Sequence, residues 1–182
     1  MLMDNSTSMD NWFYEKDSEN KTRFVLGTKG HKPLICFGIN PSTAEPNNLD
    51  NTLKSVQRTA LKKGFDSWLM LNIYPQRSTD PNGMHITFDE KIHRDNLTHI
   101  EKILAGYENP TIWAAWGTLI KTRPYLINCL ADIYSVSTKY KCNWVTIGKI
   151  SVDGHPHHPL YLDSDLPSKT FDIDAYVKST TA

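Results

Sequence analysis

Four short apolar runs, separated by segments with helical features, constrain the fold of this chain more than any other feature. The runs cover residues 34–39, 68–73, 111–116 and 144–150. Short apolar runs are typical of strands buried on both faces, and strands that alternate with helices form a parallel sheet between two helical layers. We therefore expect an α/β fold, a three-layer αβα sandwich with a central four-stranded, mainly parallel sheet. Residues 23–28 can add an N-terminal edge strand.

The segments between the runs carry the signals that start and stop helices. Asp50 or Asn51 can cap a first helix, and Gly64 can end it. Thr87 and Glu90 form a capping box that opens a second helix. The length of 182 residues fits one hydrophobic core. We expect a flexible or loosely docked N-terminal arm over residues 1–20, which are rich in Asn, Asp and Ser, and a single α/β domain over residues 21–182.

The charges and the apolar segments exclude several classes of protein. Twenty Lys and Arg residues balance twenty Asp and Glu residues, so the whole chain has no electrostatic attraction for nucleic acid or for anionic membranes. The longest apolar runs have about six residues, whereas a membrane span needs about 20. No export signal opens the chain, and three cysteines without a Cys-x-x-Cys pair indicate free thiols. We expect a soluble, cytoplasmic protein that contacts no membrane.

A polar string, Gly38-Ile39-Asn40-Pro41-Ser42, follows the first apolar run. In open α/β sheets, residues just past the carboxyl ends of the strands face the crevice that binds ligands. Gly38 permits a close approach of the backbone, and Pro41 fixes φ. The amide of Asn40 can hold a water or read the edge of a planar heterocycle. The alternative is a turn in which Asn40 and Ser42 bond only the backbone.

Two further apolar runs end in residues that can face the same crevice. The second run ends near Asn72, and the polar segment after it contains Tyr74, Arg77 and Asp80. Arg77 can pair with Asp80 or bind a phosphate through two hydrogen bonds, although the segment can also be an ordinary polar loop. The third run ends at Trp116, which can form a wall of the crevice or belong to the core.

The last run leads into a loop with the sequence His-Pro-His-His-Pro-Leu over residues 155–160. Histidine is the commonest metal ligand, but no Cys, Glu or further His stands at a familiar metal-binding spacing. We therefore expect no metal. The prolines indicate a stiff loop that holds one imidazole where its N–H can stabilise a developing anion.

In this order, the motifs resemble the family called domain of unknown function 1643 over most of residues 23–165. The matching positions are Asn-Pro-Ser-Thr-Ala at 40–44, Asp50, Thr52, Asn72, Arg77, Thr79-Asp80-Pro81, Trp116-Gly117 and His155-Pro156-x-His158-Pro159-Leu160.

More distantly, the layout is similar to the uracil-DNA glycosylase superfamily, whose fold is a four-stranded parallel sheet between helices. In that superfamily a Gly-x-Asn-Pro loop positions the attacking water, which implies this role for Asn40. A strand that ends in Leu-Leu-Asn supplies the base-reading Asn in some members, which implies that Asn72 reads the base. A late His-Pro-x-Pro-Leu loop stabilises the departing base anion, which implies this role for His155 or His158.

The resemblance implies a glycosylase-like hydrolase that acts on the N-glycosidic bond of a nucleobase, carried either by DNA or by a nucleotide, without a metal or other cofactor. The histidine loop departs from the superfamily by an extra His between its prolines, and Trp116 and Tyr74 are the candidates for the aromatic that stacks on the base. The other residues expected to line the site are Gly38, Pro41, Ser42, Asp50, Thr52, Arg77, Asp80, Gly117, His157 and Leu160. The alternative is a non-catalytic nucleotide or nucleic-acid binding module, acting in phage–host conflict.

Overall fold

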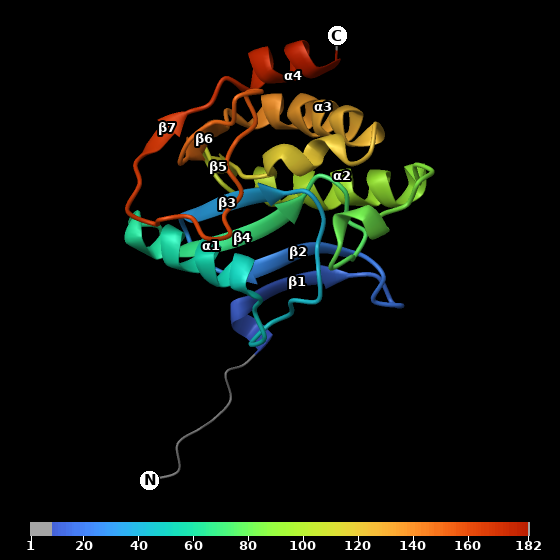
Figure 1. Ribbon diagram of the computed structural model, residues 1–182. Helices are drawn as coiled ribbons and strands as arrows, with labels where there is room; N and C mark the ends of the chain where they lie inside the picture. The colour runs from blue at the N-terminus through green and yellow to red at the C-terminus, as the bar shows by residue number, and fades with distance from the viewer. Residues whose placement is uncertain (1–8, 182) are drawn as a thin grey trace.

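The computed structural model describes residues 9–181 and has a mixed α/β fold built on one sheet (Figure 1). Within these residues the sheet has seven strands in the order β1-β2-β4-β3-β5-β6-β7. The strands are β1 (Trp12–Lys16), β2 (Arg23–Thr28), β3 (Pro33–Gly38), β4 (Ser67–Asn72), β5 (Thr111–Ala114), β6 (Asn143–Ile147) and β7 (Ser168–Thr170). The α-helices are α1 (Asn51–Lys62), α2 (Glu90–Ala105), α3 (Tyr125–Ser137) and α4 (Ile173–Thr181). The 3-10 helices are η1 (Met9–Asn11), η2 (Pro81–Gly83), η3 (Gly117–Lys121) and η4 (Thr138–Tyr140).

The strands predicted from the four apolar runs form the parallel centre of the sheet. β3 pairs in parallel with β4 and β5, and β5 pairs in parallel with β6. These strands are almost entirely buried, as continuous apolar runs require. The predicted sheet of four strands is nevertheless too small, because β1, β2 and β7 add antiparallel strands at its two ends.

β1 lies within the segment expected to be an arm, and it makes β2 an inner strand instead of an edge strand. Its aromatic residues Trp12, Phe13 and Tyr14 are half-buried against the sheet. Trp12 meets Trp68 edge-on, with ring centroids 6.2 Å apart. Aromatic packing therefore fixes this strand although its flanking residues are polar. Residues 1–8 of the expected arm lie outside the described residues.

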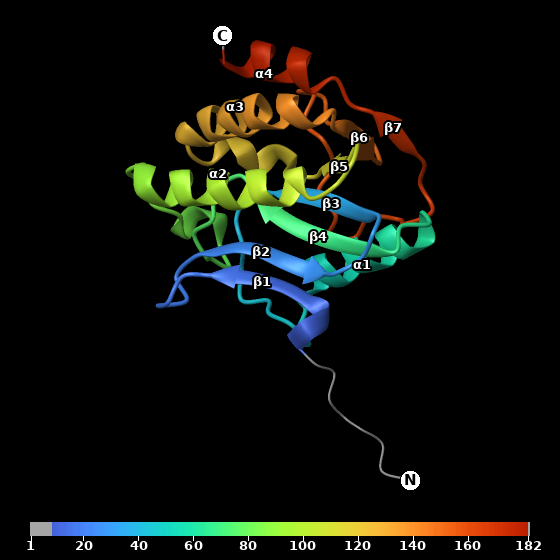
Figure 2. The same ribbon diagram turned by 180° about the vertical axis from the view of Figure 1, so that it is seen from behind.

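Helices cover both faces of the sheet. α1 covers one face (Figure 1), and α2 and α3 cover the other, which Figure 2 shows from behind. α4 packs on α3. Each face has its own buried cluster, one with apolar residues of α2, α3 and α4 and one with apolar residues of α1.

Aspartate side chains that accept backbone N–H groups of the first turn mark where α1 and α2 begin. Asp50 caps α1 as predicted, because its carboxylate accepts the N–H of Leu53 at 2.9 Å. α2 differs from the prediction, because Asp89 caps it by accepting the N–H groups of Lys91 and Ile92. An Asp one residue before the helix therefore replaces the expected capping box that begins at Thr87.

The loops that follow β3, β4 and β6 meet beside α1. The loop after β3 is bonded to the loop after β4, where Pro41 O accepts the N–H of Ser78 at 2.8 Å. The loop after β6 is bonded to α1, where the Ser55 hydroxyl donates to Pro159 O at 2.8 Å and both residues are buried. Three loops that are far apart in sequence thereby close around one region of the sheet edge.

Candidate functional site

A cavity of about 450 Å³ lies where these three loops and the N-terminus of α1 come together. Its wall is formed by Arg23, Gly38, Ile39, Asn40, Ser42, Thr43, Asp50, Asn51, Thr52, Leu53, Met70, Asn72, Ser78, Thr79, Pro81, Leu119, His158, Leu160 and Tyr161. Eight of the residues expected from the sequence are in this wall: Gly38, Asn40, Ser42, Asp50, Thr52, Asn72, His158 and Leu160.

The wall has a buried inner part and an exposed rim. Arg23 and Asn72 are 2% and 1% exposed and form part of the inner wall. Thr43, Asn51 and Tyr161 belong to the rim and are exposed. A ligand that enters the cavity therefore passes a polar rim before it reaches buried hydrogen-bonding groups.

The side chain of Asn40 is held in one orientation by the backbone around it. Its Nδ2 lies 3.0 Å from Ser78 O, 3.2 Å from Pro41 O and 3.3 Å from Gln76 O. A carbonyl oxygen can only accept a hydrogen bond, so these neighbours assign the amide nitrogen to this side. Its Oδ1 accepts no hydrogen bond within residues 9–181 and remains an acceptor in the cavity wall.

Asn72 offers a hydrogen-bond donor, whereas Asn40 offers an acceptor. Its Oδ1 accepts a hydrogen bond from Arg23 Nη2 at 3.5 Å, and its buried Nδ2 has no partner among the described residues. Asn96, which is buried behind the strand end, donates to Asn72 O at 2.9 Å. A Cβ on Gly38 would lie only 3.3 Å from Asn72 Nδ2. The bare glycine backbone therefore leaves space in front of an unpaired donor.

His158 adds a second donor from the histidine loop. The N–H of Leu160 donates to His158 Nδ1 at 3.1 Å, so in the neutral ring the proton is on Nε2. Burial and the neighbouring His157 lower the pKa of His158, and Asp50 opposes this effect only in part. The neutral ring is thus favoured, and its Nε2–H is left to donate. Gly117 lies beside this loop, since a Cβ on Gly117 would be 3.4 Å from His158 Cβ.

The N-terminus of α1 contributes a carboxylate that is already engaged. Asp50 Oδ1 accepts the N–H of Leu53, and Asp50 Oδ2 accepts the Ser42 hydroxyl at 2.6 Å. Arg77 lies behind the same loop, where it donates to Ser42 O at 2.5 Å and to the hydroxyl of Tyr14 at 2.8 Å. Arg77 therefore positions the loop and is not itself in the cavity wall.

His155 lies apart from the cavity, in the core beneath its own loop. It is 3% exposed, and its Nδ1 is 2.7 Å from the hydroxyl of Tyr176. The indole N–H of Trp116 donates to the same hydroxyl at 3.0 Å. Since Trp116 can only donate, the Tyr176 proton is free to bond His155 Nδ1. Trp116 is thus a core residue and not a wall of the crevice, and the chain Trp116–Tyr176–His155 anchors the loop that carries His158.

The remaining residues that were expected at the site lie outside the cavity wall. Tyr74 is buried, and its hydroxyl is 2.9 Å from His85 Nδ1. Asp80 is exposed and caps η2. Pro41 is buried behind the wall. His157 points away from the cavity and lines a separate hollow of about 720 Å³ next to β7.

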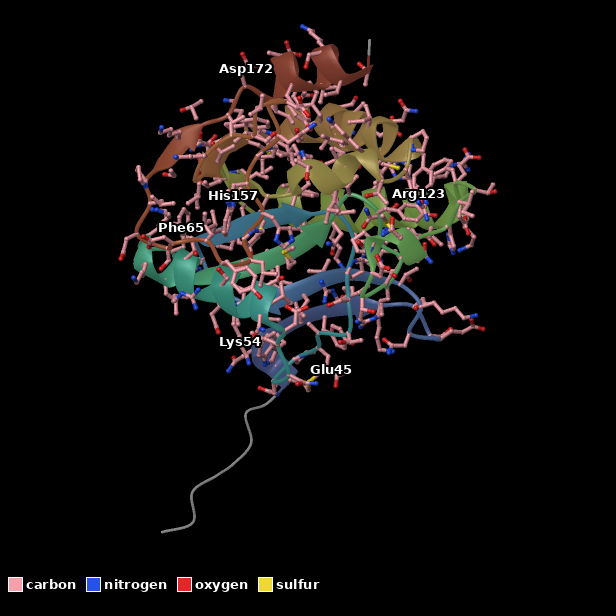
Figure 3. The ribbon with its side chains drawn as sticks, viewed as in Figure 1. Glu45, Lys54, Phe65, Arg123, His157 and Asp172 are labelled. Atoms are coloured by element: carbon pink, nitrogen blue, oxygen red, sulfur yellow. The ribbon has the colours of Figure 1, made fainter. Side chains whose placement is uncertain are left out.

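His157, Lys54 and Arg123 are among the side chains labelled in Figure 3. His157, on the loop after β6, and Lys54, on α1, lie on the face of the sheet that α1 covers, whereas Arg123, just before α3, lies apart from both. Within the described part of the chain, the Arg123 side chain donates only to backbone oxygens, those of Asn82, Met84, His85 and Thr122.

Arg23 and Tyr161 are among the wall residues that were not expected from the sequence. Arg23 opens β2, and a charge before an apolar run gives no sign of which sheet edge it faces. Tyr161 is 92% exposed and has a left-handed backbone with φ of 61°. A non-glycine residue held in this region is strained and is more frequent at functional sites. Tyr161, and not Trp116 or Tyr74, is the aromatic residue of the cavity wall.

Within residues 9–181, no three His, Cys, Asp or Glu side chains are grouped so that they could hold a metal ion. No helix in this part of the chain has the length and apolar character needed to cross a membrane.

Comparison with known proteins gives one match. No curated protein and no solved structure matches the sequence significantly. The profile of one family, described as Protein of unknown function (DUF1643), matches residues 23–160. This range contains β2 to β6, the three loops of the cavity and every residue of its wall except Tyr161. Because the match spans most of the chain, the chain belongs to the family Protein of unknown function (DUF1643).

Proposed function

We propose that this chain is a glycosylase-like hydrolase that releases a nucleobase by cleaving its N-glycosidic bond. One observation carries the proposal: Asn40 and His158, which follow β3 and β6, and Asn72, the last residue of β4, line one cavity with complementary groups. Asn40 offers an acceptor, and Asn72 and His158 offer donors. The cavity volume of about 450 Å³ falls within the range of about 300–1,000 Å³ that small-molecule sites have.

These groups fit the needs of the reaction. When the bond between the sugar C1′ and the base nitrogen breaks, its electron pair leaves with the base. Asn72 Nδ2–H and His158 Nε2–H can donate to the base atoms that collect this charge. Asn40 Oδ1 can accept a hydrogen bond from a water whose oxygen then bonds C1′. The proton lost by this water passes to the departing base or to solvent, because an amide is too weak a base to keep it.

The test is release of free base from a panel of substrates. The panel contains uracil, hypoxanthine, and hydroxymethylated or glucosylated bases in single-stranded and duplex oligonucleotides, together with the corresponding nucleotides, all with EDTA present. His158→Ala removes a donor to the developing charge and should slow release by about 10²–10³-fold. Asn40→Ala should abolish measurable release. The controls Asn128→Ala and His31→Gln change exposed residues outside the cavity and should leave the rate unchanged.

A second candidate is a nucleotide-binding module without turnover. Among residues 9–181, Asp50 is the only carboxylate in the cavity wall, and both of its oxygens already accept hydrogen bonds. The cavity therefore holds no free general base, which favours binding over hydrolysis of a stable bond. A nucleotide that raises the melting temperature while no substrate yields free base would support this second function and contradict the first.

A further inference from the structure

Two guanidinium groups meet beside the cavity without a carboxylate partner. Arg23 Nη1 and Arg77 Nη1 donate to the same oxygen, Ala44 O, at 3.1 and 3.3 Å. Within residues 9–181, neither side chain has a carboxylate oxygen within 4.0 Å. Each guanidinium is therefore hydrogen-bonded to neutral groups only, and the two like charges are neighbours.

The position of Arg23 makes this arrangement unusual. Its side chain is 2% exposed and belongs to the cavity wall. A buried charge is normally paired, because the loss of its hydration is otherwise uncompensated. Burial and the Arg77 charge lower the pKa of Arg23 to about 10, while Asp50 acts in the opposite direction. The charges of the side chains of Arg23, Arg77 and Asp50 sum to +1.

Arg23 also retains hydrogen-bonding capacity. A guanidinium has five N–H bonds, and Arg23 uses one each for Ala44 O and Asn72 Oδ1, while its Nε has no partner. On the same cavity wall, the N–H groups of Asn51 and Thr52 at the start of α1 have no acceptor among the described residues. The buried cation and the helix N-terminus both favour an anion.

We propose that the cavity binds the terminal phosphate of a nucleotide at Arg23. This inference rests on the proposed function, in which a nucleobase occupies the part of the cavity lined by Asn72 and His158. A free nucleotide is favoured over DNA because Arg23 is in the buried inner wall. A terminal phosphate can enter this region, whereas an internal phosphodiester continues as chain on both sides and needs an open groove.

Calorimetric titration with five probes tests the proposal. The probes are 2′-deoxyuridine, its 5′-monophosphate, an oligonucleotide of deoxyuridine with no terminal phosphate, and the same nucleoside and monophosphate pair of deoxyadenosine. A charge-assisted contact to Arg23 should make at least one monophosphate bind about tenfold or more tightly than its nucleoside. Equal affinities, or an oligonucleotide that binds as tightly as the monophosphate, would overturn the phosphate assignment while leaving the proposed function intact. Failure of both nucleosides and both monophosphates to bind would count against the proposed function itself.

A second experiment uses inorganic phosphate as the probe, so its result does not depend on recognition of a base. Phosphate should raise the melting temperature of the wild type more than chloride at equal ionic strength does. Asn72→Asp would place a carboxylate next to Arg23, and it should raise the melting temperature of the unliganded protein and remove the response to phosphate. Asp50→Asn keeps the helix cap and removes a negative charge, so it should strengthen the response. Arg123→Met serves as a control, because it removes an arginine that donates to carbonyl oxygens outside the cavity. Its melting temperature should respond to phosphate as that of the wild type does. A phosphate response that Asn72→Asp retains would refute the proposal.

Discussion

Replacement of Tyr176 by Phe removes one oxygen that joins two buried groups. Trp116 Nε1 donates to this oxygen at 3.0 Å, and His155 Nδ1 lies 2.7 Å from it. Trp116 is fully buried, and His155 is nearly so. Each group left without a partner costs about 1–3 kcal/mol, so Tyr176→Phe should lower the free energy of unfolding by about 2–6 kcal/mol. At this chain length a loss of that size corresponds to a melting temperature lower by about 4–24 °C.

Urea denaturation followed by tryptophan fluorescence measures this loss. Tyr134→Phe is the matched control, because its hydroxyl also bonds across α3 and α4, to Asp174 Oδ1 at 3.0 Å, but at a more exposed position. We expect the control to cost less than about 1 kcal/mol. If both variants lower the free energy of unfolding by the same small amount, the buried hydrogen bonds from Trp116 to His155 do not anchor the histidine loop, and the reasoning fails.

Two other predictions concern pH and the space in the cavity. Burial lowers the pKa values of His155 and His158, so the unfolded chain binds protons more readily than the folded chain. Stability should therefore fall as the pH drops below about 6.5, by at most about 1.4 kcal/mol per pH unit for each group. A melting temperature that is constant between pH 7 and pH 5 would contradict this, and His158→Gln should weaken the dependence. In Gly38→Ala the new methyl group would lie 2.7 Å from Met70 Cε and 3.3 Å from Asn72 Nδ2. Because the end of a Met side chain moves easily, we expect a loss of only about 1 kcal/mol of stability. Nucleotide affinity in the same variant should drop at least about tenfold, and unchanged affinity would show that the space above Gly38 is not used.

The sequence predicted the centre of the sheet well and its ends poorly. Central parallel strands are buried on both faces, so they are continuous apolar runs that can be recognised without tertiary information. β7, with the sequence Ser-Lys-Thr, is fully exposed and pairs with β6 only because the chain returns past that edge. β1 depends on packing between aromatic residues, Trp12 against Trp68, that are distant in sequence. Such strands are fixed by tertiary contacts and leave little local pattern.

The site likewise contains residues that could be placed from the sequence and residues that could not. Asn40, Asn72 and His158 could be placed together because the strands before them are parallel and all end at one edge. Arg23 could not, because it is the first residue of its strand and not a residue at the carboxyl end. It reaches the cavity only because β2 runs antiparallel to β4, which brings the start of β2 to the carboxyl end of β4. Trp116 stands close to a strand end as well, but its indole packs toward α4, a helix that the sequence pattern did not predict.

The central claim is that this cavity hydrolyses an N-glycosidic bond, and mass spectrometry of the products formed in ¹⁸O-labelled water tests it most directly. With the substrate panel described above, the wild type should yield free base and a sugar that carries one ¹⁸O atom at C1′. Asn40→Ala should yield no more than about a hundredth as much of either product. If no substrate yields free base under conditions in which a nucleotide binds the cavity, the claim is contradicted and the cavity is a binding site only.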